Sequence, residues 1–338
     1  GIVIWMTLWP LVGYFLIARF DLTMLYNARL LPYWYFGLFV FAGIAIALAC
    51  VAAARRFADR HRATLIIGAV AAVLMVGVAA VSMHDLPGWV KWNYEGYEGK
   101  QDWPEYENLM QTMDQLPPGR IMWEANSEMN KYGTPMALML FPFWSEGHQS
   151  MEGLFFESSL TTPFHFLNAS EVSARPSNPV RGLQYRGLDF DRGTKHLAVY
   201  DVGYYVSYTD EAREAAEEFG LEILAEPTPW TIFALPDSNR IDVATFEPVV
   251  WAGDEDFVDA ALEWYDDVDN LDVWLVEDGP PEWRRVTSVE ERLDGLRPIE
   301  GTGSATVTTF EDHTVRFTTD AVGVPHLVKV SYFPNWQA

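Results

Sequence analysis

Residues 30–62 read LLPYWYFGLFVFAGIAIALACVAAARRFADRHR, and this stretch decides the expected fold. Its first 25 residues carry no charge, whereas the last eight contain four arginines, one histidine and one aspartate. A bilayer core about 30 Å thick needs roughly 20 apolar residues in a helix that rises about 1.5 Å per residue. The stretch therefore predicts a membrane-spanning helix over residues 30–54, followed by a basic loop.

Two similar uncharged runs flank this helix, at residues 1–18 and 63–83. Neither run shows the polar residues at helical period that are typical of a buried helix in a soluble protein. A signal peptide is disfavoured, because Gly1 is not an initiator methionine and no basic region precedes the first run. We therefore expect three membrane spans, at about 1–18, 30–54 and 63–83, in a partial bundle whose other spans precede Gly1.

The basic loop at residues 55–62 sets the expected orientation. Loops rich in arginine and lysine remain in the cytoplasm, so residues 84–338 are expected on the extracytoplasmic side. Charge follows the same division, since residues 1–81 have six basic and two acidic side chains, a net charge of +4. The whole chain has a formal net charge of -24, which leaves -28 for residues 82–338. The sequence predicts a multi-pass protein of the cell membrane, and its acidic part excludes nucleic acid as a partner.

The extracytoplasmic part divides by composition into three regions. Residues 84–195 are rich in aromatic and acidic side chains and in irregular segments, and residues 196–299 are predicted to form a small α/β domain. Residues 300–338 alternate like the strands of a meander, too few to close two sheets, and are predicted to be an incomplete β-sandwich. The only cysteine of the chain, Cys50, lies in an apolar run, so no disulfide framework is expected.

Two helices of the predicted α/β domain have clear sequence signals. The first is expected from Asp210 to Phe219, with Asp210 as its N-cap and Gly220 as its left-handed C-terminal residue. The second is expected over residues 254–267. The predicted fold class is thus a multi-pass α-helical membrane protein, present as a partial bundle, with an extracytoplasmic mixed α/β domain and a truncated β-sandwich at the C-terminus.

Four segments resemble a family of large bacterial polytopic membrane proteins, the 6-pyruvoyl-tetrahydropterin synthase-related proteins, which look like members of the family C (GT-C) glycosyltransferase superfold. They are Asn27 to Tyr35, Met151 to Ser159, Thr162 to Asn168 and Val330 to Trp336. The resemblance implies a chain that is the C-terminal fragment of such a protein. Nothing in these segments suggests pterin chemistry.

Family C enzymes transfer a sugar from a polyprenyl-phosphate carrier to an acceptor on the outer side of the membrane. The resemblance implies that the partners are the lipid bilayer, a polyprenyl-phosphate-linked sugar and an acceptor glycan of the cell envelope. It also implies that the principal catalytic carboxylate lies in an external loop before Gly1, so no catalytic residue is assigned. The alternative is a non-catalytic, membrane-anchored structural or transport-coupled module of the envelope.

Candidate substrate-binding residues combine carboxylates and histidines with aromatic rings. Ring faces cover the apolar C–H surface of a sugar, while carboxylates accept hydrogen bonds from its hydroxyls. An arginine at the mouth of a span could bind a lipid-linked phosphate, although an interfacial arginine also occurs without a ligand. The acids could equally be a solvated surface. The candidates are Arg29, Trp123, Glu124, Glu128, Trp144, His148, Glu152, Glu157 and His165.

The sequence contains no strong signal for a metal or a cofactor. Glu146, His148 and Glu152 are close enough in sequence to share a divalent ion, but no HExxH motif or cysteine pair supports a metal site. We therefore predict neither a metal ligand nor a cofactor.

Overall fold

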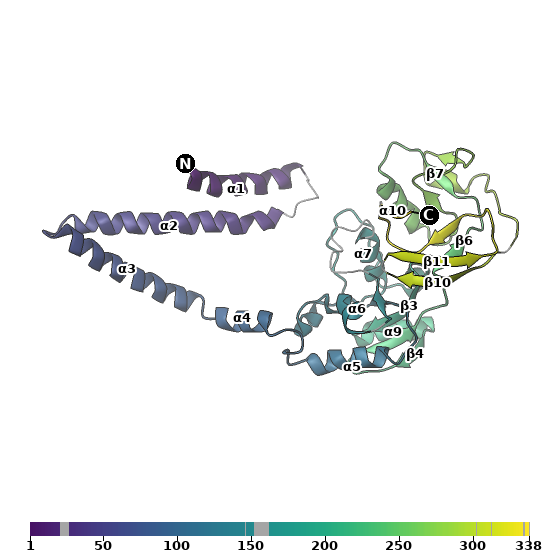
Figure 1. Cartoon of the computed structure of the whole chain (residues 1–338), viewed down its shortest axis with the longest axis horizontal. Helices are drawn as coiled ribbons and strands as arrows, with labels where there is room; N and C mark the ends of the chain where they lie inside the picture. Colours follow the sequence, from purple (N-terminus) through teal and green to yellow (C-terminus); the bar gives the residue numbers. More distant parts are fainter. Residues whose placement is uncertain are drawn as a thin grey trace. The chain divides into compact units, whose positions relative to one another are not determined.

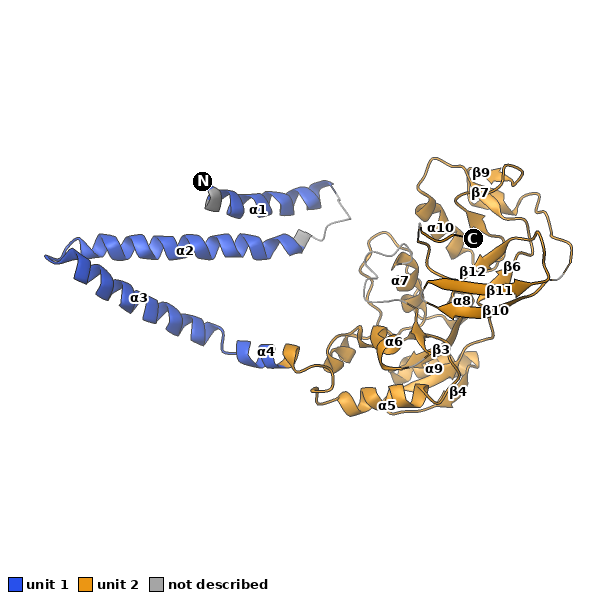
Figure 2. Ribbon diagram, in the orientation of Figure 1, with its two compact units in different colours: residues 1–91 blue, residues 92–338 orange. Residues whose placement is uncertain are grey.

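The computed structural model describes residues 1–20, 27–145, 147–151, 162–301, 303–311, 313–333 and 335–337. The chain separates into two compact units, residues 1–91 and residues 92–338 (Figure 2). The first unit is helical, whereas the second contains all of the strands that the structure describes.

The first unit is a series of helices. They are α1 (Ile2–Phe20), the 3-10 helix η1 (Asn27–Leu30), α2 (Leu31–Ala54), α3 (Arg60–Ser82) and α4 (Leu86–Tyr94) (Figure 1). The boundary between the two units, after residue 91, falls within α4. Helices α1 and α2 pack closely where Gly37 faces Thr7, because a Cβ on Gly37 would lie 2.2 Å from the Thr7 hydroxyl. The carboxylate of Asp59 caps α3 by accepting a hydrogen bond from the Arg62 N–H at 3.0 Å.

Two of the predicted spans correspond to helices that are long and apolar enough to cross a membrane, by length and composition. They extend over Ala28–Ala54 and Arg60–Ser82. The third predicted span, at residues 1–18, is not supported at full length, because the apolar helix there, Ile4–Phe20, is shorter than the two others. Over its full bounds α1 has 19 residues, which at about 1.5 Å per residue cover roughly 28 Å, so this segment is the shortest of the three.

The second unit is built on a five-stranded sheet with the strand order β2-β1-β3-β5-β4. Strand β1 is parallel to both β2 and β3, and β5 is antiparallel to both β3 and β4. The strands are β1 (Arg120–Trp123), β2 (Gln149–Ser150), β3 (Val202–Ser207), β4 (Glu222–Ala225) and β5 (Thr231–Ala234). The sheet thus joins residues of both the 84–195 and the 196–299 regions.

Both faces of this sheet are covered, because successive side chains along a strand point to opposite faces. Ile121 and Trp123 belong to one buried cluster, and Met122 between them belongs to the other. The first cluster includes α5 (Trp103–Met113), η2 (Ser127–Tyr132), η3 (Ala137–Leu140) and α6 (Phe141–Trp144). The second includes α7 (Thr162–Glu171), α8 (Phe190–Val199) and α9 (Asp210–Phe219).

Helix α9 has the bounds predicted from the sequence, but its N-cap is different. The hydroxyl of Thr209, and not the carboxylate of Asp210, accepts a hydrogen bond from the Ala212 N–H at 3.2 Å. The predicted stop is confirmed, since Gly220 has a φ of 99° and its N–H bonds to the carbonyl of Ala216.

A three-stranded sheet lies against a third buried cluster. Strand β7 (Val249–Trp251) lies between β8 (Leu275–Val276) and β9 (Arg285–Val286), parallel to both. Helix α10 (Phe257–Asp266) packs on them through the buried Ala260, and the short η5 (Glu290–Leu293) follows β9.

The C-terminal region does not form the predicted truncated β-sandwich in the residues that the structure describes. Strands β10 (Ala305–Glu311) and β11 (Thr314–Thr319) form an antiparallel hairpin. Strand β12 (His326–Val328) leaves them and pairs with β6 (Ile241–Val243), so its backbone hydrogen bonds are made in another sheet. The predicted mixed α/β character is confirmed for the unit as a whole.

Replacing Phe233 with alanine tests the two-sided core of the five-stranded sheet. Phe233 is fully buried and stacks on Tyr205 with ring centroids 6.0 Å apart. Because the vacated volume becomes a cavity, we expect the free energy of unfolding to fall by about 3–5 kcal/mol. The measurement is denaturant unfolding of the full chain in detergent micelles. Ile223→Ala is the matched control, because Ile223 pairs with Phe233 in the sheet but is 39% exposed, and its loss is expected to stay well below that of Phe233→Ala.

Candidate functional site

The residues predicted from the sequence are dispersed, and several are buried among protein partners. Trp123 is 3% exposed in the first core cluster. Glu124 is fully buried, and its two oxygens accept hydrogen bonds from the backbone N–H groups of Tyr208 and Thr209 at 2.8 and 2.7 Å and from the Thr209 hydroxyl at 2.8 Å. These donors satisfy both oxygens, so Glu124 joins the end of β1 to the start of α9.

Both predicted histidines are also buried. His148 is 2% exposed, and its Nε2 donates a hydrogen bond to the carbonyl of Met113 at 2.9 Å. His165 lies on α7 near Trp123, with ring centroids 6.1 Å apart. Burial lowers the pKa of His165 to about 4, so its imidazole is neutral at pH 7. Of the predicted residues that the structure describes, Trp123 and His165 are the pair brought into ring contact.

The other predicted residues lie elsewhere. Glu128 is exposed, and its carboxylate oxygen lies 4.0 Å from a guanidinium nitrogen of Arg175. Trp144 is half-buried against Trp103, with ring centroids 5.0 Å apart. Arg29 is exposed and belongs to the first unit. Glu152 and Glu157 lie outside the described residues.

A cavity of about 600 Å³, here called the aromatic cleft, lies where β1, β2, α10, β8 and β12 meet. Its volume is in the usual range for small-molecule sites. Its polar lining includes Arg120, Gln149, Ser150, His326, Lys329 and Ser331. Its aromatic lining consists of six half-exposed rings, Phe164, Tyr200, Phe257, Trp264, Trp274 and Trp283.

Helix α10 provides one wall of the aromatic cleft. Phe257, Ala261 and Trp264 follow one another at spacings of four and three residues, which places them on one face of the helix. The Trp264 indole N–H donates a hydrogen bond to the carbonyl of Val273 at 3.0 Å, and this bond fixes the ring. The buried Ala260 and Tyr265 face the protein instead.

The Trp283 ring is held by its own loop. A Cβ on Gly279 would lie 2.5 Å from Trp283 Cε3, so the absence of a side chain at Gly279 lets the ring lie against the loop. The guanidinium of Arg285 donates hydrogen bonds to the carbonyls of Gly279, Pro281 and Trp283 at 3.3, 3.0 and 3.0 Å. These bonds tie the loop around one side chain and preorganise the ring.

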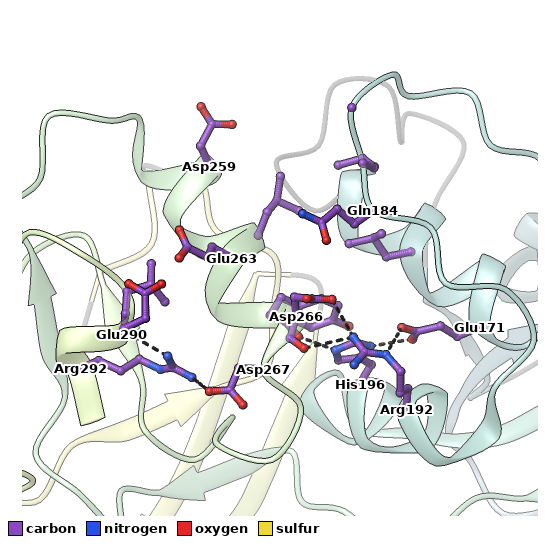
Figure 3. A pocket seen from close by; sticks show the side chains of 16 residues that line it. Glu171, Gln184, Arg192, His196, Asp259, Glu263, Asp266, Asp267, Glu290 and Arg292 are labelled. Carbon is purple, nitrogen blue, oxygen red and sulfur yellow. Dashed lines mark hydrogen bonds and ion pairs between the residues drawn. The ribbon is translucent and has the colours of Figure 1, made fainter. Parts of the chain in front are cut away.

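A second cavity, of about 560 Å³, is here called the acidic cavity (Figure 3). Figure 3 shows Glu171, Arg192 and His196 together on one side and Arg292 with Asp267 on the other. Arg192 bonds to Glu171 at 3.3 Å and to the Asp266 carboxylate at 2.9 Å. The acidic side chains that line the cavity are Glu171, Asp259, Glu263, Asp266, Asp267 and Glu290.

The buried side of the acidic cavity is occupied by the protein's own hydrogen bonds. His196 is 1% exposed, and its Nδ1 lies 2.6 Å from a Glu171 carboxyl oxygen while its Nε2 lies 2.7 Å from the carbonyl of Tyr265. The carbonyl can only accept, so Nε2 carries a proton, and one further proton is shared between Nδ1 and Glu171. The imidazole also stacks on the Tyr265 ring at 3.7 Å.

The exposed side of the acidic cavity has a pair of interacting carboxyl groups. Burial, followed by repulsion from Glu290 and a hydrogen bond with it, raises the pKa of Glu263. Hydrogen bonds from its own backbone and from Ser288 lower the pKa of Glu290. As the pH falls, Glu263 is therefore the member of the pair that takes up a proton first.

In the described part of the chain no group of three or more histidine, cysteine, aspartate or glutamate side chains is placed to hold a metal ion.

Comparison with protein-family models, with curated protein sequences and with solved structures found no match for the chain.

The aromatic cleft uses residues that the sequence analysis did not select. Of its rings, only Phe164 belongs to the aromatic-rich stretch in which the candidates were chosen. The missed signal is the density of tryptophans between residues 251 and 283, where Trp251, Trp264, Trp274 and Trp283 occur. Three of these four line the cleft.

The buried His165 predicts acid-sensitive stability. Its pKa is about 4 in the folded chain and 6.5 for an unperturbed histidine, so the unfolded chain binds the extra proton between these values. Stability therefore falls as the pH drops from 6.5 to 4, by up to about 3 kcal/mol from this group. Denaturant unfolding of His165→Phe across this range is expected to show a shallower loss than the parent chain. His313→Asn changes an exposed histidine, and its free energy of unfolding is expected to depend on pH as that of the parent chain does. A pH dependence of His165→Phe equal to that of the parent chain would contradict the prediction.

Proposed function

We propose that the protein is a membrane protein of cell-envelope glycan assembly whose second unit binds a glycan in the aromatic cleft. The observation that carries this proposal is the gathering of six half-exposed aromatic rings around one cavity with polar groups along part of its lining. Ring faces pack against the C–H groups of a sugar, and the polar groups exchange hydrogen bonds with its hydroxyls.

The polar groups of the aromatic cleft are placed by buried bonds, which favours a specific site. Lys329 has a side chain that is 3% exposed, and its Nζ donates to the carbonyl of Ala198 and to the carboxylate of Asp242, both at 2.8 Å. Arg120 donates to the carbonyls of Tyr200 and Lys329. Groups held in this way lose little freedom when a ligand binds, because they are already ordered.

The membrane part of the proposal rests on the exposure of two apolar helices. Helices α2 and α3 are long enough to cross a bilayer, and only 6% and 0% of the residues in their apolar windows are buried within the chain. A core helix of a soluble protein would bury one face, so lipid is the solvent that suits these surfaces. In the proposed topology the basic loop at residues 55–62 is cytoplasmic, as the positive-inside rule predicts, and the second unit lies outside, in a multi-pass arrangement.

The resemblance to family C glycosyltransferases supplies the reaction class of the proposal. The donor is a polyprenyl-phosphate-linked sugar, and the acceptor is the envelope glycan held by the second unit. Arg29, exposed just before α2, has the guanidinium geometry that suits a phosphate.

Cysteine labelling tests the proposed topology. Single cysteines replace Arg60 and Ser150 in a chain in which Cys50 is serine, and intact cells are treated with a membrane-impermeant thiol reagent. We expect labelling at position 150 and none at position 60 until the cells are opened. Labelling at position 60 alone in intact cells would contradict the topology.

Gly279→Ala tests the aromatic cleft without changing a residue of its lining. The new methyl group must displace the Trp283 ring, so we expect the affinity of the purified full chain for a glycan ligand to fall about tenfold, or roughly 1.4 kcal/mol. Gly253→Ala is the matched control, because its methyl group would lie 2.3 Å from the ring of Trp251, which does not line the cleft. Equal losses in the two variants would remove the cleft as the site. Binding is measured by calorimetry in detergent micelles with oligosaccharides released from the envelope.

Deletion of the gene separates the enzyme from a non-catalytic envelope module. If the protein is a transferase, we expect polyprenyl-phosphate-linked sugar to accumulate in the deletion strain and its envelope to be under-glycosylated. An unchanged pool of lipid-linked sugar would contradict the transferase and leave the non-catalytic module. Complementation with Gly279→Ala then reports whether the aromatic cleft serves the same process.

A further inference from the structure

A third cavity, of about 540 Å³, adjoins the aromatic cleft and is here called the polar cavity. Its lining includes Asp237, Ser238, Asn239, Asp242, Asp272 and Ser304. Five residues line both cavities, Val199, Trp264, Trp274, Leu327 and Lys329. The two cavities therefore meet at one layer of side chains, in which two tryptophans are the largest members.

We propose that the aromatic cleft and the polar cavity form one groove, which binds a linear, uncharged oligosaccharide across Trp264 and Trp274. This inference rests on the proposed function and adds to it the shape and the charge class of the glycan. Each cavity alone falls within the usual size of a small-molecule site, and the two together suit a chain of several sugar residues.

The junction has the chemistry that a sugar chain needs. Trp264 and Trp274 offer ring surface to both cavities, and the Trp264 ring is fixed by its bond to the Val273 carbonyl. Lys329 borders both cavities and uses two of its three ammonium donors on Ala198 and Asp242. A sugar oxygen at the junction can accept a hydrogen bond from the third N–H group of this ammonium.

Charge restricts the class of glycan. Residues 92–338 have 16 basic and 44 acidic side chains, a formal net charge of -28. The polar cavity is lined by Asp237, Asp242 and Asp272 and by two lysines. Lys195 is paired with Asp191 and Asp269, and Lys329 is paired with Asp242. The acidic unit as a whole repels an acidic polysaccharide, whereas neutral hydroxyls can donate hydrogen bonds to the carboxylates of the polar cavity. A lipid chain would fill the aromatic cleft but would leave the polar cavity without hydrogen-bonding partners.

The experiment measures the length dependence of binding to the purified full chain in detergent micelles. The probes are disaccharides and tetrasaccharides of the maltose, cellobiose, mannobiose and chitobiose series, with tetragalacturonate as the anionic comparison. A tetrasaccharide of at least one series is expected to bind about ten times more tightly than its disaccharide, because only the longer chain reaches both cavities. Tetragalacturonate is expected not to bind.

Two variants locate the second half of the groove. Ser304→Phe places a bulky ring at an exposed position in the lining of the polar cavity, and it is expected to abolish the advantage of the tetrasaccharide while leaving disaccharide binding intact. Thr306→Phe changes an exposed residue two positions further along, in β10, that lines neither cavity, and it is expected to preserve the advantage.

The outcomes separate this inference from the proposed function. Equal affinity for disaccharide and tetrasaccharide, unaffected by Ser304→Phe, would overturn the extended groove and leave glycan binding in place. Binding of tetragalacturonate as tight as that of the neutral chains would overturn the charge class. Absence of binding to all of the neutral probes, together with no binding of oligosaccharides released from the envelope, would overturn both proposals.

Discussion

The second unit depends on the hydrogen bonds of His196, which connect three helices in the protein interior. Its imidazole bonds to Glu171 of α7 and to the backbone of Tyr265 in α10, while the histidine itself belongs to α8. Hydrogen bonds to charged groups contribute about 1.5–3 kcal/mol each, and leaving one such partner buried without its bond costs more. The sheet and α10 are therefore joined by contacts that are difficult to replace one at a time.

Tyr265 extends this connection to the aromatic cleft. Its hydroxyl donates to the Asn168 side chain at 2.7 Å, and the Phe164 ring packs edge-on against it with centroids 5.0 Å apart. Phe164 and Trp264, on either side of this tyrosine, then belong to the same cavity lining. The relative position of the rings that would receive a ligand is thus set by buried polar bonds behind them, which act as support and do not themselves face the ligand.

Periodic features were predicted from the sequence, whereas long-range pairing was not. The bounds of α9 followed from a local apolar stripe and from Gly220, and the apolar length of α2 and α3 followed from composition alone. The pairing of β12 with β6 joins residues more than eighty positions apart, and short strands contain no signal for such a partner. The candidate carboxylate Glu124 was misleading for a similar reason, because only the fold brings the N–H groups of Tyr208 and Thr209 to its oxygens.

Glu124 also determines where this fold has room for a ligand. In sheets with parallel strands, ligands commonly bind beyond the carboxyl ends of the strands, where connections leave in opposite directions, and the N-terminus of a helix there attracts anions. Here β1 leads to β2 on one side and neighbours β3 on the other, and α9 begins just after β3. The protein's own carboxylate fills that position and bonds to the backbone N–H groups just before α9. The fold carries an internal substitute for a bound anion, so the backbone donors that could receive one are already used within the protein.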